Sequence, residues 1–165
     1  MKKINKILAA NRSEIAIRIF RASEEAGIKT VAIYSKEDRF ALHRFKTDES
    51  YLVGKNKGPI QAYLDIDSII DVAKKSNVDA IHPGYGFLSE NPDFAKACLD
   101  NNISFIGPSE KILKLLGNKS EAKIIAEESG VKIIPSFLVP EKIDINSLKS
   151  TAKKIGYPLI VKASW

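Results

Sequence analysis

The stretch KILAANRSEIAIRIFRASEEAGIKTVAIY, residues 6–34, contains a strand, a helix and a second strand in that order. Residues 6–10 form a short apolar run, and Thr30–Tyr34 is short and rich in β-branched residues, so both segments are predicted as strands. Between them, from Ile15 to Ala26, apolar residues recur at spacings of four, three and four, which predicts a helix with one apolar face. The segment is therefore a β-α-β unit, which is typical of a parallel sheet.

The ends of this first helix carry recognisable stop and start signals. Asn11 or Ser13 can cap its amino end, and Glu14 is placed favourably in the first turn. Gly27 follows the last periodic residue and ends the helix. These signals predict that the first strand leads directly into this helix.

The same alternation continues as far as residue 106. Further strands are predicted at residues 50–53, 78–81 and 103–106, and further helices at 66–75 and 92–99. Asn91 is the expected cap of the second of these helices, with Pro92 in its first position. The sequence thus predicts an α/β fold: an open parallel sheet with helices on both faces, whose ligands bind beyond the carboxyl ends of the strands.

The pattern changes near Gly117. After it we predict a helix at 120–129, a strand at 131–134, a helix at 145–155 and a strand at 159–163. We therefore expect two domains, residues 1–115 and residues 116–165.

Composition narrows the classes of function. The chain has 165 residues and a formal net charge of +6, but its 26 basic residues are dispersed among 20 acidic ones, which argues against nucleic-acid binding. No apolar run approaches the roughly 20 residues that span a bilayer. The single cysteine, Cys98, cannot form an internal disulfide, and no signal peptide is recognisable, so a cytoplasmic location is expected.

The decapeptide HPGYGFLSEN, residues 82–91, is the most informative motif and follows a predicted strand. Its two glycines allow the backbone to approach a ligand closely, and Tyr85 offers a flat face and a hydroxyl group. The residues alone also fit a simple turn between strand and helix, in which Ser89 and Asn91 only cap. His82, which precedes a proline, fits a turn or core histidine better than a catalytic base.

This decapeptide resembles the signature of biotin carboxylases. Residues 10–18, 105–108, 156–158 and 162–164 resemble other stretches of that family in the expected order. The resemblance implies a Rossmann-like pre-ATP-grasp domain followed by the beginning of an ATP-grasp domain. Within the family, residues 34–38, 42–46 and 163–165 are more similar to pyruvate carboxylases than to the subunits of acyl-CoA carboxylases.

The resemblance also implies a reaction and its ligands. ATP activates bicarbonate, and the carboxyl group passes to biotin on a mobile carrier domain. Lys119 and Lys162 match family lysines that contact ATP, and Tyr85 and Gly86 match the part of the signature on the biotin side. Without the resemblance, Lys119 could simply be solvated, whereas Lys162 interrupts an apolar run and fits a strand edge or a polar cleft equally well. The chain should supply no catalytic residue and no Mg²⁺ ligand, because in the family these lie after the residues matched here.

The resemblance further implies partners. Arg18, Arg21 and Glu25 match the dimer interface of bacterial biotin carboxylases, although their spacing also fits a solvated helix face. The expected partners are the biotinyl carrier domain, bicarbonate, the rest of a carboxylase and a second copy in a homo-oligomer. We expect the N-terminal part of a biotin carboxylase module that is inactive alone. The alternatives are the biotin carboxylase of an acetyl-CoA or propionyl-CoA carboxylase, or a non-catalytic binding or dimerisation module.

Overall fold

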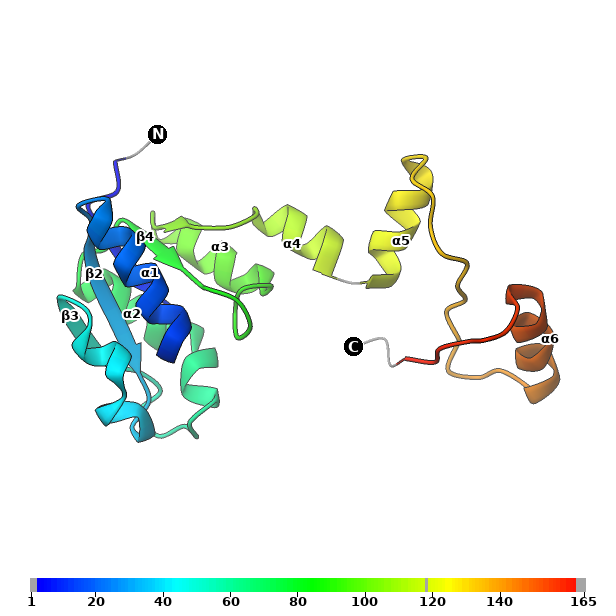
Figure 1. The fold of residues 1–165 in the computed structure, drawn as a ribbon, viewed down its shortest axis with the longest axis horizontal. Helices are drawn as coiled ribbons and strands as arrows, with labels where there is room; N and C mark the ends of the chain where they lie inside the picture. The colour runs from blue at the N-terminus through cyan, green and yellow to red at the C-terminus, as the bar shows by residue number, and fades with distance from the viewer. Residues whose placement is uncertain (1–2, 118, 163–165) are drawn as a thin grey trace. The chain divides into compact units, whose positions relative to one another are not determined.

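The computed structural model describes residues 3–117 and 119–162. Contacts within the chain divide it into two compact units, Met1–Lys114 and Leu115–Trp165. The first unit contains every strand of the described residues and positions the candidate site (Figure 1).

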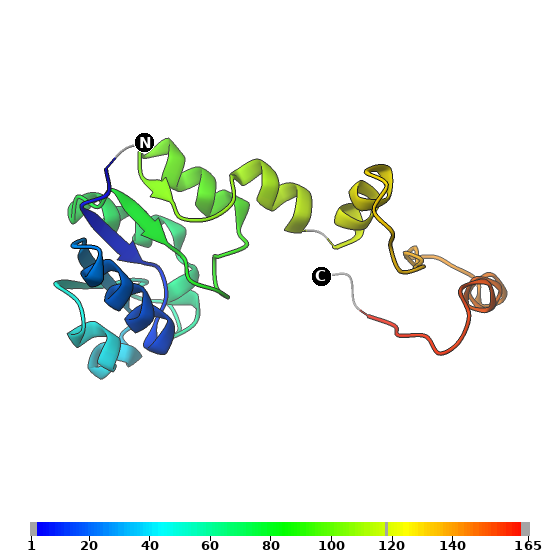
Figure 2. The ribbon, with the colours of Figure 1, turned by 45° about the horizontal axis from the view of Figure 1, so that its top comes forward.

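The first unit is built on a five-stranded sheet in which every neighbouring pair of strands is parallel. Its strand order is β3-β2-β1-β4-β5. The chain adds strands to one side of β1 and then crosses to the other side, so the order reverses between β1 and β4. In Figure 2 these two strands run side by side in the same direction. The strands are β1 (Lys6–Ala9), β2 (Lys29–Tyr34), β3 (Glu49–Leu52), β4 (Ala80–His82) and β5 (Ser104–Phe105).

Helices cover both faces of this sheet, which confirms the predicted fold class. Helix α1 (Ser13–Glu25) packs on one face, whereas α2 (Ile66–Lys75) and α3 (Pro92–Asp100) pack on the other. Connections between parallel strands are right-handed, so a chain that reverses its direction across the sheet must place its helices on the opposite face. The reversal after β3 therefore explains the side on which α2 and α3 lie.

Alternate residues of the central strands point to opposite faces of the sheet. Leu8 and Val31 join the core under α2 and α3, while Ala9 and Ala32, the next residue in each strand, contact α1. Successive strand residues point to opposite faces, so a strand covered on both sides becomes a continuous apolar run. The short alanine side chains allow Phe20 of α1 to pack closely, and Phe20 is almost fully buried.

Three short 3₁₀ helices occupy the connections on either side of β3. They are η1 (Glu37–Phe40), η2 (Leu42–Phe45) and η3 (Gln61–Leu64). None of these three helices was predicted from the sequence. Each buries few side chains, but η2 buries His43 and η3 buries Tyr63.

Helix caps were predicted with mixed success. The Asn91 side chain accepts a hydrogen bond from the Phe94 amide at 2.9 Å, which confirms it as the cap of α3. The prediction that Asn11 or Ser13 caps α1 is wrong, because the cap residue is Arg12 and no side chain caps this helix. The Asn11 side chain instead bonds to backbone carbonyls of the loop that follows β4, the strand next to β1.

The second unit differs most from prediction. It is entered through α4 (Glu110–Gly117), which the sequence analysis missed, and it contains α5 (Lys119–Glu128) and α6 (Ile145–Ile155). The predicted strands at 131–134 and 159–163 are wrong for the described residues, which have no regular structure there; residue 163 lies outside the described residues. A strand needs a hydrogen-bonded neighbour, and the apolar side chains here remain in solvent: Val161 is 91% exposed.

Candidate functional site

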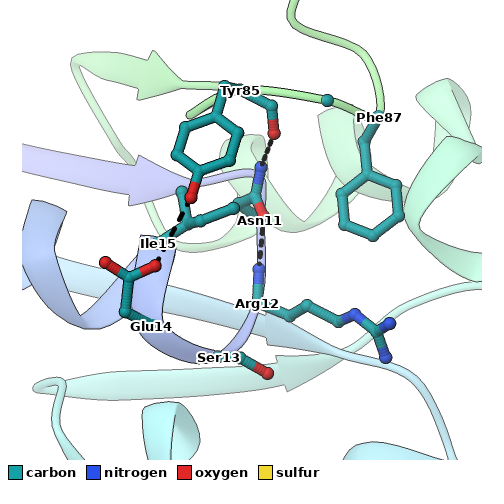
Figure 3. Close-up of a pocket in the computed structure, with 8 residues that line it drawn as sticks. Asn11, Arg12, Ser13, Glu14, Ile15, Tyr85 and Phe87 are labelled. Atoms are coloured by element: carbon teal, nitrogen blue, oxygen red, sulfur yellow. Dashed lines mark hydrogen bonds between the residues drawn. The ribbon is translucent and has the colours of Figure 1, made fainter.

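The candidate site lies at the carboxyl ends of β1 and β4, where the strand order reverses. Open α/β sheets bind ligands at this point, because the segments leaving the two strands diverge and leave a crevice between them. A pocket of about 390 Å³ occupies it (Figure 3). Its lining residues are Asn11, Arg12, Ser13, Glu14, Ile15, Tyr85, Gly86 and Phe87.

Two sequence segments that are far apart in the chain form this pocket. One is the turn from β1 into α1, and the other is the loop after β4, which carries the predicted Tyr85 and Gly86. The structure thus places both biotin-side candidates in one pocket. The residues of the first segment were not predicted to line a pocket, although their position directly after a strand was a usable signal.

The Asn11 side chain joins these two segments. Its Nδ2 donates hydrogen bonds to the Pro83 carbonyl at 2.7 Å and the Tyr85 carbonyl at 3.0 Å, while its Oδ1 accepts one from the Arg12 amide at 2.9 Å. Figure 3 shows Asn11 beneath the loop, with the Tyr85 ring projecting beside it. A buried amide with all of these partners satisfied fixes the local geometry on both sides.

The Tyr85 side chain is the most accessible aromatic group of the pocket. It is 65% exposed, and its hydroxyl donates a long hydrogen bond of 3.4 Å to Glu14 Oε2. The Glu14 carboxylate also forms an ion pair with Arg18, four residues further along α1, at 3.5 Å. Because this hydrogen bond is long, the Tyr85 hydroxyl can leave the Glu14 carboxylate and bond instead to a ligand with polar edges.

Beside Phe87, charged and aromatic side chains form a network of contacts around the pocket residue Arg12. The Arg12 guanidinium lies 5.8 Å from the centroids of both the Tyr63 and Phe87 rings and forms an ion pair with Asp38 at 3.3 Å. The Tyr63 hydroxyl donates to Asp38 Oδ2 at 2.7 Å and accepts from the Ser35 amide. Burial, and secondarily this bond to the carboxylate, raise the pKa of Tyr63, so the phenol stays protonated and acts as a structural donor.

The loop after β4 depends on backbone conformations that favour glycine. Gly84 and Gly86 have φ angles of 68° and 70°, and Phe87 has a φ of 41°. A Cβ on Gly84 would lie 2.7 Å from Asn11 Nδ2 and 2.6 Å from Ile15 Cγ2, whereas nothing lies within 4 Å of a Cβ on Gly86. Gly84 is required by close packing, and Gly86 leaves open space in the pocket.

Both histidines have structural partners. His82 Nδ1 accepts a hydrogen bond from the Gly84 amide at 3.0 Å, as expected of a turn histidine. His43 is fully buried, and its Nε2 lies 3.1 Å from the Ile33 carbonyl. Burial lowers the pKa of both side chains. Neither histidine lines the pocket.

The remaining candidates are not among the residues that line the pocket. Lys119 is the first residue of α5, and its side chain is outside the described part of the structure; Lys162 is exposed in an irregular segment of the second unit. Arg18, Arg21 and Glu25 are exposed on α1.

No group of three or more His, Cys, Asp or Glu side chains among residues 3–117 and 119–162 could hold a metal ion. None of the helices in these ranges has the length and apolar character of a membrane span.

Residues 3–113 match the family described as "Biotin carboxylase, N-terminal domain". The chain belongs to this family. The match covers the sheet, α1 to α3 and the whole pocket lining. The match confirms the resemblance to biotin carboxylases that the signature at residues 82–91 indicated.

Individual relatives of this biotin carboxylase N-terminal domain agree. Pyruvate carboxylase of Bacillus subtilis (strain 168) is 53% identical over 163 residues, which are 99% of this chain and 14% of the relative. A solved structure of Rhizobium etli pyruvate carboxylase with the allosteric activator acetyl coenzyme A superposes with a TM-score of 0.90 at 52% identity, over 99% of this chain and 15% of that one.

A second solved structure shows ligands bound to a relative. The biotin carboxylase domain dimer of Hydrogenobacter thermophilus 2-oxoglutarate carboxylase, in complex with MgADP, ADP and bicarbonate, has a TM-score of 0.89 and 43% identity. The alignment covers 99% of this chain and 36% of that one. The chain thus spans about a seventh of the length of the curated relative it matches, at 14%.

Proposed function

We propose that this chain is the leading domain of the biotin carboxylase module of a pyruvate carboxylase, and that the pocket between β1 and β4 is part of its biotin side. In the intact enzyme, ATP and bicarbonate supply an activated carboxyl group for the ureido nitrogen of biotin, which then serves the conversion of pyruvate to oxaloacetate. The observation that carries the proposal is that Tyr85 and Gly86 line a pocket at the reversal of strand order.

The pocket suits a small ligand with a flat polar edge. Its volume of about 390 Å³ lies near the lower end of the range of ligand pockets, about 300–1,000 Å³. The Tyr85 hydroxyl can turn from Glu14 to a ligand, and the absence of a side chain at Gly86 leaves the backbone accessible. These residues would orient biotin, and none of them is proposed as a catalytic residue.

Nucleotide binding is proposed for the second unit. Lys119 and Lys162 would contact ATP as part of an ATP-grasp domain, because a lysine is a compact cation suited to phosphate oxygens. The described residues offer no carboxylate cluster for Mg²⁺, so its ligands would come from residues beyond those described. The nucleotide and bicarbonate in the 2-oxoglutarate carboxylase structure support these ligands for the intact enzyme.

Partners follow from the same proposal. Arg18, Arg21 and Glu25 would contribute to a homodimer interface, since all three are exposed on α1 and a related biotin carboxylase domain is a dimer. A biotinyl carrier domain would present biotin to the pocket. We keep a cytoplasmic location as part of this proposal, because Cys98, the single cysteine, is buried and unpaired.

A chimera tests the proposal. This chain replaces the matching segment of the Bacillus subtilis relative, and bicarbonate-dependent ATP hydrolysis is measured with and without free biotin, beside the isolated chain. Activity in the chimera alone is expected. An inactive but folded chimera would favour the binding-module alternative.

A variant pair then tests the pocket. Tyr85→Ala should raise KM for biotin more than KM for ATP, because it removes a group that only biotin contacts. Leu99→Ala, which truncates an apolar side chain of similar exposure, 70%, on α3, is the matched control. Equal KM values for biotin in the two variants would remove Tyr85 from the site.

A further inference from the structure

Asn11 joins the two halves of the pocket through hydrogen bonds from its side chain to backbone. It is fully buried directly after β1, yet its side-chain amide donates to two carbonyls, those of Pro83 and Tyr85, in the loop after β4. The orientation of the amide follows from its partners, because two acceptors face Nδ2 and a donor, the Arg12 amide, faces Oδ1. Asn11 therefore uses both amide hydrogens on a segment more than 70 residues away.

The loop that Asn11 holds has hydrogen bonds of its own, from the Gly84 amide to His82 Nδ1 and from the Ser89 amide to the Gly86 carbonyl, but neither engages the Pro83 or Tyr85 carbonyl. Gly84 and Gly86 both have positive φ angles, and glycine has wide conformational freedom when nothing else constrains it. The carbonyls that Asn11 engages stand on either side of Gly84, and Gly84 approaches the Asn11 amide closely enough to exclude a Cβ. The two hydrogen bonds from Asn11 thus hold the backbone on both sides of Gly84, a residue with wide conformational freedom.

A second anchor lies just past the exposed Tyr85 ring. Phe87 keeps a positive φ of 41°, and its ring stacks on Tyr63 with centroids 5.2 Å apart. The backbone at Tyr85 and Gly86 is therefore held by Asn11 on one side and by the packing of Phe87 on the other. Because the Tyr85 ring itself is mostly in solvent, its position depends on these backbone anchors rather than on packing.

We infer that Asn11 is a positioning residue for the biotin side of the site: its buried amide sets where Tyr85 and Gly86 stand. The assignment of biotin as the ligand rests on the proposed function. The hydrogen bonds by which Asn11 holds the loop do not depend on that assignment, and they can be measured in this chain alone.

Asn11→Asp is the sharpest variant. The carboxylate keeps an acceptor for the Arg12 amide and nearly the same shape, but it has no hydrogen to donate and faces two carbonyl oxygens. Ser76→Ala is the matched control, since Ser76 is also buried and its hydroxyl donates to a backbone carbonyl, Val72, at 2.7 Å. Ser76 lies beside Lys6, at the opposite end of β1 from Asn11.

Two measurements are made. In ¹H–¹⁵N spectra of the full 165-residue chain, the Asn11 side-chain amide should exchange with solvent far more slowly than that of the exposed Asn56, and Asn11→Asp should shift the Tyr85 and Gly86 amide resonances. In the chimera, Asn11→Asp should lower kcat/KM for biotin about 10- to 100-fold, the scale of a misplacement near 1 Å, and should lower kcat/KM for ATP by a clearly smaller factor. Ser76→Ala should change neither set of values.

The outcomes separate the two ideas. If the wild-type chimera is inactive, the proposed function fails, but the spectra still decide whether Asn11 clamps the loop. Fast exchange of the Asn11 side-chain amide, or equal losses of biotin and ATP parameters in Asn11→Asp, would overturn the inference while leaving the proposed function intact. If Asn11→Asp does not fold, Asn11→Ser, which shortens the side chain and removes the amide, is measured in its place with the same criteria.

Discussion

Replacing Gly84 by alanine tests the packing at the centre of the site. The backbone there has a φ of 68°, where a side chain costs about 1–2 kcal/mol. The added Cβ would also stand 2.6 Å from Ile15 Cγ2 and 2.7 Å from Asn11 Nδ2. Overpacking of this kind costs about 1–3 kcal/mol, and the Asn11 amide cannot swing away without breaking its two hydrogen bonds. Together the two costs predict a loss of about 2–5 kcal/mol in the free energy of unfolding.

Gly86→Ala and Gly27→Ala are matched controls. Their φ angles of 70° and 69° impose the same backbone cost, but no atom lies within 4 Å of the added Cβ. We therefore expect each to lose only about 1–2 kcal/mol. The difference from Gly84→Ala isolates the close contact.

Urea denaturation followed by near-ultraviolet circular dichroism measures these losses, because the buried Tyr63 and Phe94 report on the first unit. The slope of the unfolding free energy with urea should be the same in all variants, so that midpoints compare stabilities. Equal midpoints for Gly84→Ala and Gly86→Ala would refute the close packing of Asn11 against the loop.

Three further outcomes are expected. Asn91→Ala removes the cap that accepts the Phe94 amide and should lower the unfolding free energy by about 1 kcal/mol in the same urea assay. Burial raises the pKa of the Cys98 thiol to about 12, so a thiol reagent at pH 8 should leave it unmodified in the folded chain and react in urea; fast reaction without urea would contradict its burial. Burial lowers the pKa of His43 below its ordinary 6.5, so as the pH falls below about 6.5 the unfolded chain takes up the proton first. Stability should therefore be fully present above that pH and decline below it, and His43→Gln should flatten the decline in urea midpoints between pH 7.5 and 5.5, both about one unit from the ordinary pKa.

The first unit was predictable from sequence because its signals are local. A helix forms its hydrogen bonds within one segment, so apolar spacing from Ile15 to Ala26 and the stop at Gly27 were enough for α1. Buried parallel strands are short apolar runs, and β1 and β2 stood out for that reason. The same reasoning failed at residues 131–134 and 159–162, where equally apolar runs have no neighbouring strand.

The candidate site was predicted only in part. The signature at residues 82–91 pointed to Tyr85 and Gly86, and both line the pocket. The local pattern predicts Asn11 or Ser13 as a helix cap, because a helix follows directly in the sequence. Nothing near Asn11 in the chain indicates that Pro83 and Tyr85 are its partners.

The sequence alone is enough to assign the fold class, the family and the segment that carries Tyr85, since each depends on neighbouring residues or on a contiguous motif. Only the tertiary structure decided that β4 pairs with β1, and this pairing brings the loop after β4 onto the Asn11 amide. The physical reason is that strand order and side-chain hydrogen bonds between distant segments are fixed by the packing of the whole sheet. A polar residue at a strand end has the same local pattern whether it caps the next helix or holds the adjacent loop.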